Sequence, residues 1–139
     1  MTEPNDWNAT LIAEYRANQG RVKGQFDGHP LLLLTTTGRR SGQPRTSPIM
    51  YLPDSDRLLV FASKAGADTD PAWYLNLLAT PQVTVELGAE TFGALATPLQ
   101  GEERDRHYAE QASRYPGFAE YQSKTDRVIP VVALERLQP

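Results

Sequence analysis

The sequence predicts a mainly β protein of the α+β class: a small barrel of six antiparallel strands with an N-terminal helix and two helical inserts. Two observations support this prediction. Six short runs rich in aliphatic and β-branched residues follow one another at close spacing, and turn-forming residues separate most of them. Closing such a sheet also removes the exposed edges that apolar strands would otherwise leave.

Length and composition agree with one domain. The chain has 139 residues, of which 40% are hydrophobic, and this is enough for a compact core. We therefore expect a single barrel domain over residues 1–139. Within it, residues 1–30 provide a helix and a loop, and residues 31–139 provide the barrel.

The N-terminal part predicts a helix that packs on the barrel. Helix signals run over Asn5–Gln19, with Asn5 or Asp6 as cap and Gly20 as stop, and a loop is expected over Arg21–Pro30. The face that packs on the core carries an apolar stripe at the spacing i, i+4, i+8, formed by Trp7, Leu11 and Tyr15. A lid or a membrane-touching helix is the alternative, although the few basic residues argue against the membrane version.

Six segments are predicted to be strands. The turn at residues 53–56 joins the second and third into a hairpin, and Gly88-Ala89 separates the fourth from the fifth. Pro48 marks an edge or a bulge in the second strand, because proline has no N–H to donate. In chain order the expected strands are Leu31–Thr37, Arg45–Leu52, Arg57–Ser63, Val83–Leu87, Glu90–Leu99 and Val128–Leu137.

Two inserts interrupt the strands with helices. The first is a short helix over Pro71–Ala79, for which Asp70 is a favourable N-cap. Asn76 is the polar exception on this apolar helix, and it is interpreted either as a surface or cap residue or as a donor to a bound ring. The second insert is a charged helix over Glu102–Tyr115, followed after Pro116-Gly117 by a further helical turn.

Three aromatic residues follow one another at helical spacing near the end of the second insert. Tyr115, Phe118 and Tyr121 stand at i, i+3 and i+6, which predicts that they share one face. Aromatic residues at this spacing belong to the core more often than to a site. Here the flanking sequence is polar, so an aromatic wall that faces a site is the second interpretation.

The turn between the first two strands concentrates positive charge. It holds Arg39, Arg40, Ser41 and Arg45 together with two glycines. Guanidinium groups bind phosphate or carboxylate oxygens, and backbone amides in glycine-containing turns hold anions. A solvated basic hairpin tip is the alternative. A second loop, Ser63-Lys64-Ala65-Gly66, again combines a hydroxyl, an amine and a glycine turn.

Several classes of function lack the residues that they need. The net charge of −3 argues against a nucleic-acid partner, and without cysteine there is neither a disulfide nor a thiolate nucleophile. His29 and His107 lack the spacing of zinc ligands, so we expect no metal. No Walker loop or dinucleotide fingerprint occurs, and neither histidine suggests a catalytic triad.

No apolar run approaches about 20 residues, and no signal peptide is evident. We therefore expect a cytoplasmic protein without stable membrane insertion, for which peripheral contact with a membrane stays open. The features that remain are an anion-holding turn and aromatic surface. They suit a flat, phosphate-bearing cofactor that carries the reactive chemistry itself.

Four motifs resemble the deazaflavin-dependent nitroreductase family of actinobacteria. In chain order they are TTTGRRSGQPRTSP (35–48), ASKAG (62–66), PAWYLNL (71–77) and YPGFAEYQSKTDRVIP (115–130). The resemblance runs from Leu31 almost to the end of the chain. It implies a split β-barrel of the FMN-binding type that uses the reduced 8-hydroxy-5-deazaflavin coenzyme F-420.

The resemblance also implies roles for the matching residues. The coenzyme's phosphate and glutamate tail would be held by Arg39, Arg40, Ser41 and Arg45. The residues that would line its ring and ribityl chain are Ser47, Pro48, Ala62, Ser63, Lys64, Ala65 and Gly66, with Trp73 and Asn76 closing the pocket. The wall on the acceptor side would consist of Tyr115, Phe118 and Tyr121, of which the two tyrosines are candidate proton donors.

The implied reaction is hydride transfer from the reduced coenzyme to a small-molecule acceptor, a quinone or a nitroaromatic compound. Phe118 departs from the pattern, because we expect tyrosine there in the nitroimidazole-activating member of the family. We therefore expect quinone reduction and little reduction of bicyclic nitroimidazoles. An FMN-dependent oxidoreductase and a non-catalytic flavin or deazaflavin carrier are the alternatives, and the protein is expected to be a monomer or a homodimer.

Overall fold

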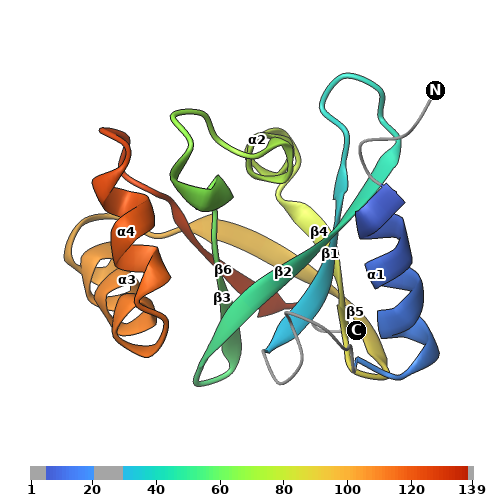
Figure 1. The fold of residues 1–139 in the computed structure, drawn as a ribbon. Helices are drawn as coiled ribbons and strands as arrows, with labels where there is room; N and C mark the ends of the chain where they lie inside the picture. Colours follow the sequence, from blue (N-terminus) through green and yellow to red (C-terminus); the bar gives the residue numbers. More distant parts are fainter. Residues whose placement is uncertain (1–5, 21–29, 138–139) are drawn as a thin grey trace.

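The computed structural model, which describes residues 6–20 and 30–137, contains a closed barrel of six antiparallel strands (Figure 1). The strands follow the order β1-β2-β3-β6-β5-β4, and β4 pairs with β1 to close the barrel. The predicted fold class is therefore confirmed. The strands are β1 (Leu31–Thr37), β2 (Pro44–Asp54), β3 (Arg57–Phe61), β4 (Gln82–Leu87), β5 (Glu90–Pro98) and β6 (Val131–Arg136).

The run of four leucines in β1 is buried on both faces of the strand. Leu32 and Leu34 belong to the core inside the barrel. The other two, Leu31 and Leu33, pack outside the barrel with Leu11 and Tyr15 of α1 (Asp6–Ala17). A strand that is covered on both faces has a continuous apolar sequence instead of an alternating one. This explains why β1 shows no alternation.

The Tyr15 hydroxyl ties α1 to the barrel. It donates to the carbonyl oxygen of Leu31, 3.0 Å away, and accepts from the amide of Gly88 at 2.9 Å. Burial raises the pKa of Tyr15, which keeps this hydroxyl protonated. The predicted packing of α1 is confirmed for the stripe residues with described side chains. The prediction for Trp7 lies outside the described side chains, and that for the loop Arg21–Pro30 lies, except at its last residue, outside the described residues.

Three further helices surround the barrel. The helix α2 (Ala72–Ala79) lies at one end of it and contributes Leu77 to the inner core. The helices α3 (Gly101–Arg114) and α4 (Gly117–Ser123) lie on the opposite side from α1 (Figure 1), where they pack on the outer face of β3 and β6. Among the helices of residues 6–20 and 30–137, none combines the length and apolar character needed to cross a bilayer.

The third and sixth strands are shorter than predicted. β3 ends at Phe61, and the chain then forms a short 3₁₀ helix, η2 (Lys64–Gly66), where a loop was expected. β6 begins at Val131 instead of Val128. The reason is that Pro130 has no N–H with which to extend the ladder.

The N-cap role predicted for Asp70 is wrong. The cap residue of α2 is Pro71, and no side chain caps this helix end. The Asp70 carboxylate instead accepts a hydrogen bond from the Arg127 guanidinium at 2.9 Å. With its carboxylate bonded to Arg127, Asp70 lies outside the helix, which begins at Ala72.

Candidate active site

The turn between β1 and β2 is held closed by its own hydrogen bonds. The amide of Gly38 donates to the carbonyl of Gln43 at 2.8 Å, and the amide of Gly42 donates back to Gly38 at 2.8 Å. The Ser41 hydroxyl oxygen accepts from the Gln43 amide at 3.1 Å. A Cβ atom on Gly38 would lie 2.6 Å from this oxygen, so the turn requires glycine there. These bonds fix the backbone from which the arginines extend.

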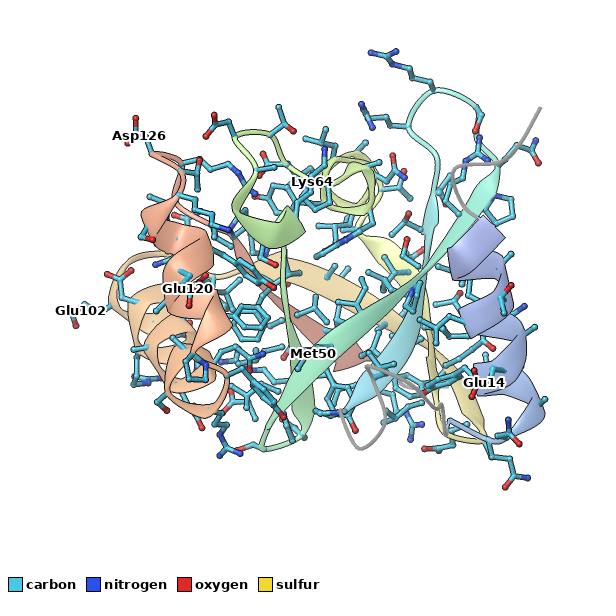
Figure 2. All side chains as sticks on the ribbon, viewed as in Figure 1. Glu14, Met50, Lys64, Glu102, Glu120 and Asp126 are labelled. Atoms are coloured by element: carbon cyan, nitrogen blue, oxygen red, sulfur yellow. The ribbon has the colours of Figure 1, made fainter. Side chains whose placement is uncertain are left out.

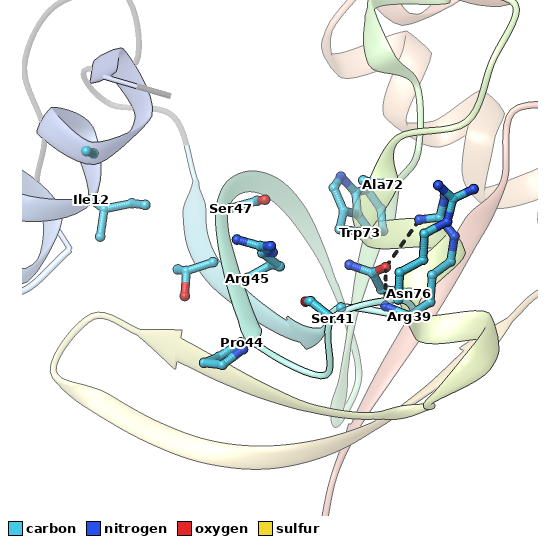
Figure 3. A pocket seen from close by; sticks show the side chains of 13 residues that line it. Ile12, Arg39, Ser41, Pro44, Arg45, Ser47, Ala72, Trp73 and Asn76 are labelled. Carbon is cyan, nitrogen blue, oxygen red and sulfur yellow. Dashed lines mark hydrogen bonds between the residues drawn. The ribbon is translucent and has the colours of Figure 1, made fainter. Parts of the chain in front are cut away.

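Asn76 of α2 anchors the first arginine of the turn. Its side-chain oxygen accepts from the backbone amide of Arg39 at 3.1 Å and from the Arg39 guanidinium at 3.3 Å (Figure 3). Its side-chain nitrogen donates to the Thr36 hydroxyl at 3.1 Å. Asn76 is 3% exposed, so its interpretation as a surface or cap residue is wrong. Both atoms of its amide therefore have protein partners, and these bonds hold the turn against α2.

A pocket of about 550 Å³ lies beside this turn. The arginine turn forms one wall, α2 supplies Trp73 and Asn76, and Ile12 of α1 lies across the opening (Figure 3). It is also lined by five residues to which the resemblance gave coenzyme-binding roles: Arg39, Arg40, Ser41, Arg45 and Ser47.

The charge of the turn is not neutralised within the described part of the chain. Among the described side chains, those of residues 9–20, 30–64 and 66–137, no carboxylate pairs with Arg39, Arg40 or Arg45, which are all exposed. Other arginines, such as Arg57 and Arg136, each pair with a carboxylate. Guanidinium groups that have no carboxylate partner among the described side chains, and that lie at the rim of a pocket, favour an anion-binding turn over the alternative interpretation, a solvated basic hairpin tip.

A second pocket of about 370 Å³ adjoins the first. Ser47 and Trp73 line both, so the two pockets meet at these residues. The second pocket is largely apolar and aromatic, and its lining includes Pro48, Phe61, Ser63, Lys64, Phe118 and Tyr121. The combined site therefore has an arginine-rich end and an end lined by aromatic rings.

The loop that carries Lys64 has an unusual backbone. Lys64 has a φ of 47°, which is rare for a residue with a side chain, and its amine donates to the Thr69 hydroxyl at 3.0 Å. Gly66 has a φ of 82°, and a Cβ atom there would lie 2.8 Å from the carbonyl oxygen of Tyr121. The loop therefore packs directly on α4. Figure 2 shows Lys64 on η2, at the same end of the barrel as α2.

Some of the expected site residues do not line either pocket. Ala62 is fully buried and Gly66 is covered by α4, so both support the loop from behind. The prediction for the Ala65 side chain lies outside the described side chains.

The shared face predicted for the three aromatic residues is wrong for Tyr115. α3 ends at Arg114, and Tyr115 has a non-helical backbone with φ −133° and ψ 89°. It packs beside the outer core, whereas Phe118 and Tyr121 lie together on α4 with ring centroids 5.2 Å apart. The i, i+3 rule fails here because the chain changes direction at Pro116.

Two residues that support the site were missed. The Tyr108 hydroxyl donates to the carbonyl of Phe118 at 2.6 Å, and burial raises the pKa of Tyr108. Arg127 donates four hydrogen bonds to the loop between β3 and α2. For Arg127, the sequence offered one signal: an arginine within a segment that is otherwise typical of a turn. No sequence signal indicated Tyr108, because α3 reads as a charged surface helix.

The barrel, the arginine turn and the aromatic pocket define a class of protein: a β-barrel in which a cationic pocket adjoins a pocket lined by aromatic rings. Comparison with known proteins gives the family. The family model described as F420H(2)-dependent quinone reductase matches residues 7–136. An F420H(2)-dependent quinone reductase of Mycobacterium tuberculosis is 42% identical over 133 residues, which cover 89% of this chain and 86% of that protein.

Two solved structures are similar in fold and sequence. An F420-H2 dependent reductase, FDR-A, superposes with a TM-score of 0.70 at 41% identity, over 76% of this chain and 94% of that one. A structure described as a domain-swapped dimer gives 0.71 at 38% identity, over 96% of this chain and 100% of that one. The chain therefore belongs to the F420H(2)-dependent quinone reductase family, a family of oxidoreductases that depend on reduced coenzyme F-420. The resemblance drawn from the four motifs is confirmed.

Proposed function

We propose that this protein transfers a hydride from reduced coenzyme F-420 to a quinone. The observation that carries the proposal is the junction of the two pockets at Ser47 and Trp73, with exposed arginines on one side and aromatic side chains on the other. When bound, the reduced coenzyme supplies the hydride, and reduction of a quinone to a hydroquinone consumes that hydride together with one proton.

The residues of the first pocket fit the coenzyme's anionic part. Arg39, Arg40 and Arg45 offer guanidinium groups for a phosphate and for the carboxylates of a glutamate tail. Asn76 holds Arg39 by two hydrogen bonds, which reduces the conformational freedom that binding would have to remove. The chemistry of this donor set therefore matches the group that the family uses.

The second pocket suits a flat, apolar acceptor. Phe118 and Tyr121 of α4 and Phe61 of β3 present rings to it, and Trp73 lies at its border with the coenzyme side. Holding donor and acceptor side by side and excluding water are the main contributions that a protein makes to hydride transfer. The Tyr121 hydroxyl is the candidate proton donor within this lining, whereas Tyr115 lies outside it.

The second pocket also supports a small molecule as the partner in the reaction.

Of the two assemblies that the sequence left open, the similarity to a domain-swapped dimer favours the homodimer over the monomer. Light scattering of the purified protein tests this assignment, and a mass of one chain would exclude the dimer.

The test of the proposed function is the steady-state oxidation of reduced coenzyme F-420 by menadione, followed by the absorbance of the oxidised coenzyme. We expect turnover that depends on both the protein and the quinone. A protein that binds the reduced coenzyme but leaves it reduced when menadione and nitroarenes are added would instead be a carrier. A protein that turns over only with reduced FMN would be a flavin oxidoreductase.

A further inference from the structure

We propose that Arg127 is a positioning residue of the second pocket. It would hold the loop of residues 62–70 against α4, and would thereby set the position of Lys64 relative to Tyr121 in the lining of that pocket. The inference rests on the proposed function, because it takes this pocket as the place of the acceptor.

The Arg127 guanidinium donates four hydrogen bonds, all to the loop of residues 62–70. Its Nε donates to the carbonyl of Ala67 at 2.7 Å, and its Nη2 to the carbonyl of Ser63 at 2.8 Å. Its Nη1 donates to the carbonyl of Ala62 at 3.1 Å and to the Asp70 carboxylate at 2.9 Å. Three of these acceptors are backbone atoms, and they bracket η2 on both sides. Only a planar fork of N–H donors reaches several such acceptors at once.

The backbone of Arg127 is tied to α4 at the same time. Its carbonyl oxygen accepts from the Gln122 side chain at 2.7 Å, and Gln122 belongs to α4. Its amide donates to the Thr125 hydroxyl at 3.2 Å. The arginine therefore links the helix that carries Phe118 and Tyr121 to the loop that carries Lys64. Both segments line the 370 Å³ pocket.

The loop depends on this link. Ala62 is fully buried, and its carbonyl oxygen accepts a hydrogen bond from Arg127. Without Arg127 this bond is lost at a position that bulk water does not reach, which destabilises the loop. Lys64 holds a left-handed φ of 47°, a conformation that persists only where its surroundings enforce it. The close contact of Gly66 with Tyr121 leaves no room for the loop to approach α4 further. Loss of the arginine should therefore let the loop move away from the helix.

The test compares Arg127→Lys with Arg104→Lys as a matched control. Arg104 is also largely buried, and it donates to the Ile129 carbonyl and to Gln122, but none of its hydrogen bonds reaches residues 62–70. Both substitutions keep the charge and remove the fork, so both should lower stability. Only Arg127→Lys should change the position of the loop.

The first readout is single-turnover oxidation of bound reduced coenzyme F-420 by menadione, at a temperature where both variants are folded. For Arg127→Lys we expect a hydride-transfer rate about 10- to 100-fold below wild type, because small misplacements of reactants cost that much. We also expect a larger deuterium isotope effect with coenzyme labelled at C5. For Arg104→Lys the rate should stay within about twofold of wild type.

The second readout is amide hydrogen exchange of residues 62–70 without coenzyme. Exchange should accelerate in Arg127→Lys and stay unchanged in Arg104→Lys. If Arg127→Lys does not fold, Asp70→Asn removes the charged acceptor alone and should show the same effects in weaker form. Equal rates and equal exchange in the two arginine variants would overturn the inference. If wild type neither binds nor oxidises the reduced coenzyme, the proposed function fails, and the exchange experiment still decides whether Arg127 holds the loop.

Discussion

Replacing Arg45 with alanine is expected to weaken the binding of coenzyme F-420 roughly 10- to 100-fold and to leave the free energy of unfolding almost unchanged. The loss corresponds to about 1.5–3 kcal/mol for a hydrogen bond to a charged partner. Arg45 lines the first pocket, and no hydrogen bond or ion pair within the described residues occupies its exposed guanidinium. Fluorescence titration gives the affinity, and denaturant unfolding gives the stability.

Arg39→Ala and Arg114→Ala complete this experiment. Arg39→Ala should cost as much affinity as Arg45→Ala, and slightly more stability, because it also removes one of the bonds to Asn76. Arg114 is exposed, and within the described part of the chain its one ion pair is with Glu110, one helical turn away, so Arg114→Ala should change neither quantity. A fall in stability with unchanged affinity in the turn variants would show that these arginines are structural.

Phe118→Tyr is expected to raise the rate of bicyclic nitroimidazole reduction by at least tenfold over a slow wild type. Phe118 lines the acceptor pocket next to Tyr121 but offers no hydroxyl. General acid catalysis by a positioned group typically contributes 10²–10⁴-fold, and a new hydroxyl in the lining should recover part of it. A quinone is less demanding, since its developing oxyanion can take a proton from water. The measurement is steady-state oxidation of the reduced coenzyme with each acceptor.

Tyr121→Phe is the matched variant, because it removes a hydroxyl from the neighbouring position on α4. It should lower the rate with quinones only slightly, because water can also supply that proton, and it should leave coenzyme affinity nearly unchanged. Rapid nitroimidazole reduction by the wild type would show that a hydroxyl at Phe118 is dispensable. No gain in Phe118→Tyr would show that the ring cluster of Phe61, Tyr108 and Phe118 is packing alone.

Local sequence signals predicted the barrel and the cationic part of the site. The strand Leu31–Thr37 has its predicted bounds, because an apolar run followed by glycine determines both the strand and its end. The arginine turn was predictable for the same reason, since all of its residues lie within one hairpin. Charge and turn chemistry are properties of neighbouring residues and can be read directly.

The residues that position the site could not be predicted, because their partners are far away in the chain. Asn76 contacts Arg39 across 37 positions, and Arg127 contacts Ser63 across 64. A lone amide on an apolar helix looks like a surface residue until the helix is placed against the turn. The prediction for Tyr115 failed for a local reason: helical spacing was assumed across Tyr115 and Pro116, whereas α3 ends at Arg114 and the residue before a proline is disfavoured in helical conformation.

The central claim is that the site binds a deazaflavin with an anionic tail. Its most direct test is a parallel fluorescence titration of the protein with coenzyme F-420 and with FMN. Trp73 lines both pockets and should report binding, and a Trp73→Phe variant assigns the signal. FMN shares the phosphate but lacks the tail, so it forgoes at least one charge-assisted contact with the arginines.

We expect coenzyme F-420 to bind at least about tenfold more tightly than FMN, and Arg45→Ala to remove most of that difference. Equal affinities of the wild-type protein for the two compounds would contradict the assignment of the arginine turn to the coenzyme tail.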